Sequence, residues 1–290
     1  MEKPIKIFVE IFRIFYGELF NKKNKFLTRI KRIIARFKVS NILISLIRIL
    51  NQNKKIDTYP TLYKDLNINE ATNKLNQEGI YKEIILPNDK LQEVLNFCEN
   101  NDFNYNRDPS IKIKFNKRLK QNDLYIMNIN NPHQECEAIN RIFKDEKIIQ
   151  IVKNYLGVNP KINSTQIFWS IPCFDQNENP IIPPNNEFGY HYDIDGFKFL
   201  KLFFYLTDVI GEDSGYHVFV RKDKKDKNFN ERIFRRVSEE IIEEKYKDRL
   251  LKVFGKKGTG FFEDTSCYHK GNFPLKERGM LACIYNITDW

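Results

Sequence analysis

Residues 191–209 read HYDIDGFKFLKLFFYLTDV, and this stretch decides how the chain is interpreted. It opens with the spacing His-x-Asp, formed by His191 and Asp193, and continues as an apolar run typical of a buried strand. A metal site is best built where its ligands stand at the mouth of a rigid strand. We therefore predict that His191 and Asp193 are two ligands of a metal ion.

A third ligand and a cation follow later in the chain. His269 ends a segment that begins with the glycine turn Gly258-Thr-Gly260, and Arg278 comes nine residues after it. Two imidazoles and one carboxylate can hold divalent iron on one face of its octahedron, which leaves the other face for a chelating co-substrate and dioxygen. Arg278 is the group that the far end of a dicarboxylate co-substrate would need. The pattern predicts an oxygen-activating enzyme.

Competing interpretations exist for several of these residues. Asp195 is a second carboxylate, but Asp193 has the one-residue spacing from His191 and is preferred as the ligand. His217 is expected to be a strand residue, because the ligand set is complete without it. His133, next to Pro132, is expected to lie in a loop. The alternative for His191 and His269 is that both are ordinary loop histidines.

The stretch 191–209 resembles the metal-binding turn and following strand of the phytanoyl-CoA dioxygenase family, which are iron(II)/2-oxoglutarate oxygenases. Three further segments resemble the same family: Gly215-Tyr-His-Val-Phe-Val220, residues 258–278, and Tyr155-Leu-Gly157 followed by Gln166 to Ser170. The resemblance covers about residues 75–290. It implies an α+β fold in which a double-stranded β-helix (a cupin-like jelly roll) is buttressed by helices.

The resemblance also implies a cofactor set. Fe(II) would be held by His191, Asp193 and His269, and the distal carboxylate of 2-oxoglutarate by Arg278. Gln166 would contact the co-substrate or the substrate, with a purely structural role as the alternative. The reaction would convert 2-oxoglutarate and O2 to succinate and CO2 while a substrate is hydroxylated. Relatives that transfer halide leave the carboxylate position empty, so Asp193 implies a hydroxylase and not a halogenase.

Two departures from the family pattern concern the pocket. The run Arg221 to Lys227 replaces a Gly-Ser-His-type turn, and we expect it to be a solvated loop that could attract an anionic substrate. Gly271 stands where a small hydroxyl or amide residue is usual, two places after His269. The residue that contacts the inner carboxylate of 2-oxoglutarate therefore stays open.

The order of expected elements agrees with the implied fold. Helices are predicted near residues 67–77, 88–100, 134–143 and 146–156, and strands at 79–86 and 124–129. From Lys161 onward the chain changes to short β-rich runs bounded by Pro, Gly, Asn and Asp, with a helical insertion at 239–252. Helices followed by about eight strands suit a jelly roll. Trp169 and residues 203–205 either line this barrel or belong to its core.

The charge is concentrated at the N-terminus. Residues 1–50 contain 12 of the 48 Lys and Arg residues and 3 of the 38 Asp and Glu residues, a net charge of +9, whereas the remaining residues carry only +1. A nearly neutral body argues against a nucleic-acid-binding protein. Five widely spaced cysteines without a Cys-x-x-Cys pair argue against disulfides and zinc clusters, and they fit a cytoplasmic protein.

The N-terminal segment has helical periodicity at residues 4–20 and again at 26–50. In the second stretch Lys25, Arg29, Arg32 and Arg36 form a basic stripe. A basic amphipathic helix can lie on an anionic membrane, such as the inner membrane face. The same helices could instead pack on the body of the protein or bind a partner. We divide the chain into a helical extension and linker, 1–56, and an oxygenase domain, 57–290.

Three hypotheses for function follow. The leading one is a 2-oxoglutarate-dependent hydroxylase of a small or lipid-like molecule. The second is a membrane-associated enzyme that hydroxylates a lipid or glycan precursor, because of the basic N-terminal helices. The third is a catalytically silent jelly-roll binding protein, against which the full set of ligands and Arg278 argues.

Overall fold

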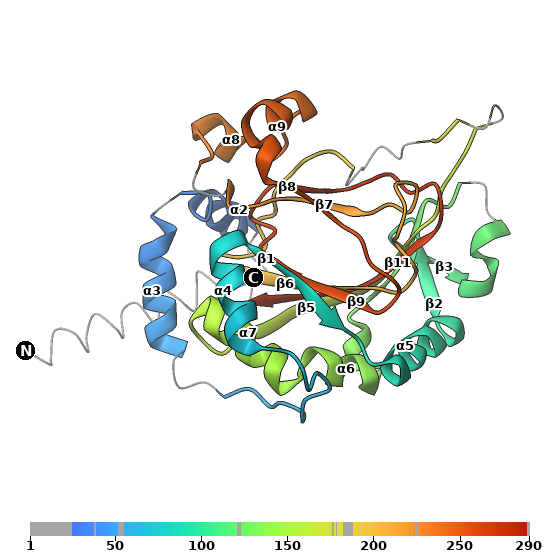
Figure 1. Cartoon of the computed structure of the whole chain (residues 1–290), viewed down its shortest axis with the longest axis horizontal. Coiled ribbons are helices and arrows are strands. Elements are labelled where there is room, and N and C mark those ends of the chain that lie inside the picture. Colours follow the sequence, from blue (N-terminus) through green and yellow to red (C-terminus); the bar gives the residue numbers. More distant parts are fainter. Residues whose placement is uncertain are drawn as a thin grey trace, which may run out of the picture.

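A large antiparallel sheet organises the structure, and the chain reaches it by way of helices (Figure 1). The computed structural model describes residues 25–37, 39–51, 55–120, 123–175, 177, 179–181, 188–223 and 226–288. Its helices are α2 (Lys25–Ile34), α3 (Ser40–Asn51), α4 (Ile68–Glu78), α5 (Asn88–Asn100), α6 (Glu137–Phe143), α7 (Glu146–Leu156), α8 (Phe229–Ile233) and α9 (Glu239–Tyr246). Short 3₁₀ turns cover Phe115–Lys120, Pro132–Gln134 and Lys247–Arg249.

Two sheets form the jelly roll. The larger has the order β1-β9-β6-β11-β5-β4-β2-β3, and the smaller has the order β10-β7-β8. The strands are β1 (Ile80–Ile85), β2 (Asp102–Tyr105), β3 (Asp108–Lys114), β4 (Ile126–Asn130), β5 (Lys161–Ser170), β6 (Phe199–Tyr205), β7 (His217–Val220), β8 (Leu250–Val253), β9 (Thr259–Glu263), β10 (His269–Gly271) and β11 (Arg278–Asn286). The order of strands in both sheets is far from their order in the sequence, as expected for a jelly roll built from long-range antiparallel pairs.

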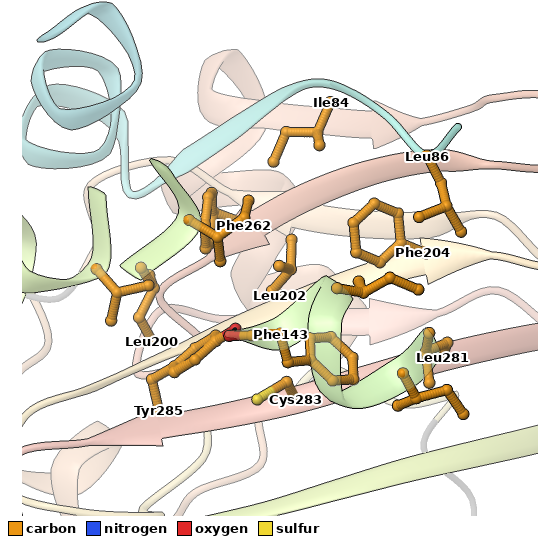
Figure 2. Packing of buried hydrophobic residues seen from close by; sticks show 14 of the residues in the cluster. Ile84, Leu86, Phe143, Leu200, Leu202, Phe204, Phe262, Leu281, Cys283 and Tyr285 are labelled. Carbon is orange, nitrogen blue, oxygen red and sulfur yellow. Dashed lines mark hydrogen bonds between the residues drawn. The ribbon is translucent and has the colours of Figure 1, made fainter. Parts of the chain in front are cut away.

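Helices α4 to α7 lie on the side of the large sheet that faces away from β7 and β8 (Figure 1). Alternate residues of β6 and β11 point to these helices and are almost fully buried: Leu200, Leu202, Phe204, Leu281, Cys283 and Tyr285. Figure 2 shows them packed with Phe143 and Phe262. Because side chains alternate across a strand, the intervening residues of the same strands face the smaller sheet.

Local signals in the sequence explain the helix boundaries. The side chain of Asn67 accepts hydrogen bonds at the start of α4, and Gly79 ends the helix with a positive φ of 83°. Asp145 accepts two backbone bonds at the start of α7, which stops at Gly157 with φ 82°. The expected helices near 67–77, 88–100 and 146–156 and the strands near 79–86 and 124–129 are therefore found where the sequence placed them.

Two expectations about elements were wrong. The helical insertion predicted for 239–252 ends at Tyr246, and its last residues, Leu250–Val253, form strand β8. There Leu250 and Leu251 pair with Val220 and Phe219 of β7, so partner strands override a helical periodicity. The polar stretch after α5 contains the unpredicted hairpin β2–β3, whose outer strand β3 is mostly exposed.

No described helix is long and apolar enough to span a bilayer.

The N-terminal segment is packed on the body where the structure describes it. The periodic stretch 26–50 is divided into α2 and α3. Ile44 and Ile47 of α3 are buried in the same cluster as the helix side of the sheet, and Arg48 donates to the carbonyl of Leu156 at 2.8 Å. Arg36, after α2, donates to the carbonyl of Ile233 in α8 at 2.7 Å. The expected helix at 4–20 lies outside the described residues.

Candidate metal centre and cavity

A cavity of about 440 Å³ lies on the face of the large sheet that the helices do not cover. Its floor consists of residues in register on three neighbouring strands. Ala282 of β11 pairs with Gln166 of β5 and with Phe203 of β6, and Ile284 pairs with Ser164 and Lys201. The complete lining is Arg107, Asn130, Asn131, Ser164, Thr165, Gln166, Phe168, His191, Asp193, Lys201, Phe203, His217, His269, Gly271, Arg278, Met280, Ala282 and Ile284. All five residues predicted for the site therefore line one cavity.

His191, Asp193 and His269 come together on the cavity wall. One ligand atom from each lies within 4.8 Å of the others. Nε2 of His269 is 3.4 Å from Oδ2 of Asp193, and Nε2 of His191 is 4.0 Å from Oδ1. The backbones of His191 and His269 exchange two hydrogen bonds, of 3.0 and 2.8 Å, which fixes the turn after residue 190 against the start of β10. Main-chain hydrogen bonds thus bring together two histidines that are 78 residues apart in the sequence.

The backbone also sets the orientation of both imidazoles. Nδ1 of His191 bonds the carbonyl of Gly189 at 2.9 Å, and Nδ1 of His269 bonds the carbonyl of Cys267 at 3.0 Å. A carbonyl can only accept, so each Nδ1 carries the proton, and in a neutral ring the lone pair is on Nε2. Both Nε2 atoms lie close to the Asp193 carboxylate. This is the arrangement in which histidines bind a divalent cation.

Charges around the triad keep Asp193 ionised. Burial raises the pKa of this carboxyl, but Lys201 and then His269 outweigh burial and hold it well below its usual range. Burial lowers the pKa of His269, and the Asp193 carboxylate outweighs that effect, so the pKa of His269 is raised. A metal ion binding at Nε2 must displace a proton held there, so binding is favoured as pH rises.

Arg278 lies beside the triad, at the start of β11. It is 3% exposed, and it donates to the carbonyl of Gly215 at 2.5 Å and to Oγ of Ser170 at 3.2 Å. A Cβ added to Gly271 would lie 3.2 Å from Nη1 of Arg278. Gly271 is two residues after His269, which places it about 7 Å further along the strand. The guanidinium of Arg278 lies beside this position. The guanidinium of Arg278 therefore occupies part of the space that a side chain at position 271 would fill.

Gln166 projects from β5 into the cavity, next to other hydrogen-bonding groups. Its Nε2 donates to Oδ1 of Asn130 on the neighbouring strand at 2.9 Å. Ser164, Thr165 and Asn131 complete this polar wall. The amide is therefore held by a protein partner and still faces the cavity.

Sequence reasoning missed the pair His217–Glu263. His217 is a residue of β7, as expected, but it also lines the cavity, and its Nε2 lies 3.0 Å from Oε2 of the fully buried Glu263. His217, Glu263 and His269 form a second group with metal-ligand spacing. The other carboxylate oxygen, Oε1 of Glu263, lies 3.9 Å from Nδ1 of His269, whose proton is donated to the carbonyl of Cys267. Because Nδ1 of His269 points to Glu263 and its Nε2 to Asp193, the lone pair of this imidazole is on the side of the triad.

Sequence reasoning also missed Lys201, although it is a lysine within an apolar strand. Its Nζ lies 2.7 Å from Oδ2 of Asp193 and 2.8 Å from Oδ2 of Asp195. Burial lowers the pKa of Lys201, but the two carboxylates outweigh burial and raise it. The period of two along β6 places Lys201 and Phe203 on the same face, which is the signal that could have identified it.

Other residues singled out in the sequence are distributed as follows. Of the aromatic candidates only Phe203 lines the cavity; Trp169 and Phe204 belong to the helix-side core, and Tyr205 is fully buried between the sheets. His133 lies in the 3₁₀ turn after β4, with Nδ1 2.7 Å from Oγ1 of Thr165.

The run 221–227 is only partly solvated in its described residues: Lys222 and Asp226 are exposed, as expected, whereas two others are buried. Asp223 is fully buried, Lys227 is 6% exposed, and they form an ion pair at 2.7 Å. Nζ of Lys227 also lies 4.2 Å from the ring centroid of Tyr268, beside His269. Two of the charged residues of this run therefore form an ion pair inside the protein.

Comparisons with known proteins bear on the fold. No family model and no curated protein sequence matches the chain. Among solved structures it is similar to EctD from S. alaskensis in its apoform, with a TM-score of 0.53, 15% identity, and coverage of 81% of this chain and 82% of that one. EctD with bound Fe gives a TM-score of 0.50, 13% identity and coverage of 81% and 82%. At such low identity the likeness establishes the shared jelly-roll fold.

Proposed function

We propose that the chain is an iron(II)- and 2-oxoglutarate-dependent dioxygenase, with His191, Asp193 and His269 as the metal ligands. The observation that carries this proposal is the triad itself, two Nε2 atoms and one ionised carboxylate preset on the wall of a cavity. Two imidazoles and a carboxylate form the ligand set of non-haem iron oxygenases. The similar EctD structure contains bound Fe, which supports the choice of metal.

Arg278 would bind the distal carboxylate of 2-oxoglutarate. It is buried at one end of the cavity, close to the triad, and its guanidinium can form a charge-assisted pair with a carboxylate. The hydrogen bonds to Gly215 and Ser170 orient it before the ligand arrives. Bound iron would supply the activation of dioxygen that drives decarboxylation of 2-oxoglutarate and oxidation of a substrate C–H bond.

The remaining residues would position and enclose the reactants. Gly189 and Cys267 hold the imidazoles through their carbonyls, and Phe203 and Met280 keep the floor apolar. Asp193 fills the position that a halide-transferring enzyme would leave free, so hydroxylation is the favoured outcome. A catalytically silent protein is disfavoured because it would not need the preset triad together with a buried arginine.

The lining favours a small substrate with hydrogen-bonding groups over a lipid-like one. Asn130, Asn131 and Gln166 offer amide groups, and Ser164 and Thr165 offer hydroxyls, on one side of the cavity. Arg107 adds a cation on the same lining. A long acyl chain would cover these polar groups without offering them hydrogen bonds, which is unfavourable.

A second proposal concerns the N-terminal segment. Ile42 and Ile49 lie on the outer face of α3, 63% and 56% exposed, and Arg32 is exposed on α2. This combination suits peripheral contact with an anionic membrane on the cytoplasmic side. We keep 1–56 and 57–290 as functional units, although Ile44 and Ile47 anchor α3 in the main core. Ile42→Ser with Ile49→Ser should weaken cosedimentation with phosphatidylglycerol vesicles; unchanged binding would remove the proposal.

The main proposal is tested without knowledge of the substrate. Fe(II) and 2-oxoglutarate are added anaerobically to the metal-free protein, and the weak visible charge-transfer band of the chelate is recorded. We expect a band for the wild type, no band for Asp193→Ala and a weaker one for Arg278→Ala. If the wild type binds neither iron nor 2-oxoglutarate, the oxygenase function is wrong and a jelly-roll binding protein is the better account.

A further inference from the structure

Lys201 connects the metal ligand Asp193 to the neighbouring carboxylate Asp195. The side chains of Lys201 and Asp193 are 14% and 15% exposed, and that of Asp195 is 29% exposed. Both carboxylates contact the same ammonium group, at 2.7 and 2.8 Å. Two carboxylates held by one buried cation form a unit, and only one of them belongs to the triad.

The contacts divide the oxygens of Asp193 between partners. Oδ2 accepts from Lys201 and also lies 3.4 Å from Nε2 of His269, whereas Oδ1 lies 4.0 Å from Nε2 of His191. Arg235 approaches Oδ1 from outside, with its Nη2 at 3.6 Å. Both oxygens of Asp193 therefore face a histidine nitrogen of the triad, and Lys201 shares Oδ2 with His269.

We propose that Lys201 is the positioning residue of the metal centre: it holds Asp195 in an ion pair, so that Asp193 is the carboxylate left to bind the metal. This inference rests on the proposed function, because it concerns the same ion. It adds an explanation of why Asp193, and not Asp195, would bind the metal, and of what keeps coordination positions open for the co-substrate and dioxygen.

The physical argument is charge competition. Asp195 is only two residues from Asp193, and an unpaired carboxylate so close to a divalent cation would be attracted to it. Asp195 as a fourth protein ligand would fill a position that a chelating co-substrate and dioxygen need. The ammonium group pairs with Asp195 and also repels the metal, so it lowers metal affinity and keeps the open face of the metal free.

The test measures metal affinity, not turnover. Free Mn(II) is followed by electron paramagnetic resonance during titration of metal-free wild type and of Lys201→Met. We expect Lys201→Met to bind Mn(II) at least tenfold more tightly. The double variant Lys201→Met/Asp195→Asn has the net charge of the wild type and should return to within about threefold of its affinity.

Lys198→Met is the matched control. Lys198 lies just before β6, donates to the carbonyl of Tyr155 and is not part of the cavity lining, so its loss should leave Mn(II) affinity unchanged. If Lys201→Met does not fold, Lys201→Gln serves in its place.

A second measurement tests whether coordination positions of the metal remain free for 2-oxoglutarate. In the Co(II)-loaded protein, 2-oxoglutarate should change the visible spectrum of the wild type and of the double variant, and change that of Lys201→Met much less. Mn(II) affinity of Lys201→Met equal to or weaker than that of the wild type overturns the inference alone. Failure of the wild type to bind Mn(II) overturns the proposed function as well.

Discussion

The two faces of the large sheet use the same strands for opposite purposes. On β6, Leu200, Leu202 and Phe204 pack against helices, whereas Lys201 and Phe203 line the cavity. On β11, Leu281 and Cys283 are buried among apolar neighbours, whereas Met280 and Ala282 face the cavity. Alternate residues of each strand therefore pack in the core or line the cavity. Substitutions on one face should have a limited effect on the other face.

The sharpest contrast is between two adjacent phenylalanines. Phe204 is fully buried and stacks near Tyr63 and Phe143, so Phe204→Ala should lower the free energy of unfolding by about 3–5 kcal/mol. Phe203 borders an existing cavity, so Phe203→Ala should cost about half as much. Urea denaturation of both variants measures the difference, and equal losses would contradict the division between faces.

Removal of a metal ligand should show the reverse contrast. His269→Ala should weaken Mn(II) binding by about 100-fold or more, because one of three ligands is lost. Its free energy of unfolding should change by less than about 2 kcal/mol, since the metal-free protein loses no large apolar contact. His133→Ala is the control, and comparable weakening of metal binding in that variant would refute the assignment.

A small change at Gly271 tests the arginine end of the cavity. A Cβ at this position would lie 3.2 Å from Nη1 of Arg278, so Gly271→Ser should displace the guanidinium. We expect the Kd for 2-oxoglutarate of the Mn(II)-loaded protein to rise about threefold to tenfold, which corresponds to roughly 1 kcal/mol. Lys270→Ser, one residue away, should leave the Kd unchanged; a similar rise there would show that the effect is not specific to Arg278.

The smallest expected signal concerns thiols on both faces. All five cysteines are buried, and burial raises the pKa of Cys98 to about 12 and also raises that of Cys267 and Cys283. At pH 8 these groups stay protonated and should not react with Ellman's reagent in the native protein, because the thiolate is the reactive form. Rapid modification of one of them before unfolding would mean that its face of the sheet opens.

The sequence predicted that His191, Asp193 and His269 come together, but it did not predict which residues surround them. His191, Asp193 and His269 could be identified because their spacing accompanies an apolar strand and a glycine turn. Lys201 and Glu263 could not be ranked in the same way, because a charged residue in a strand acquires its meaning only from what faces it. The pairing of β6 with β9 and β11 decides that, and sequence alone does not specify these partners.

The fold shows the same limit. Caps such as Asn67 and Gly157 are local, so the bounds of α4 and α7 could be predicted closely. Strand β8 could not, because its helical periodicity is overridden by pairing with β7. The hairpin β2–β3 was missed although Ile111 and Ile113 alternate with lysines in β3, because the alternation is short and only Ile113 is buried.

The central claim is that the cavity face binds a metal ion and a dicarboxylate together. Isothermal titration of 2-oxoglutarate into metal-free and Mn(II)-loaded protein tests it most directly. We expect one molecule to bind the Mn(II)-loaded protein, and binding at least about 100-fold weaker without Mn(II), because chelation supplies much of the affinity. Equal binding with and without Mn(II), or no binding in either case, would contradict the account.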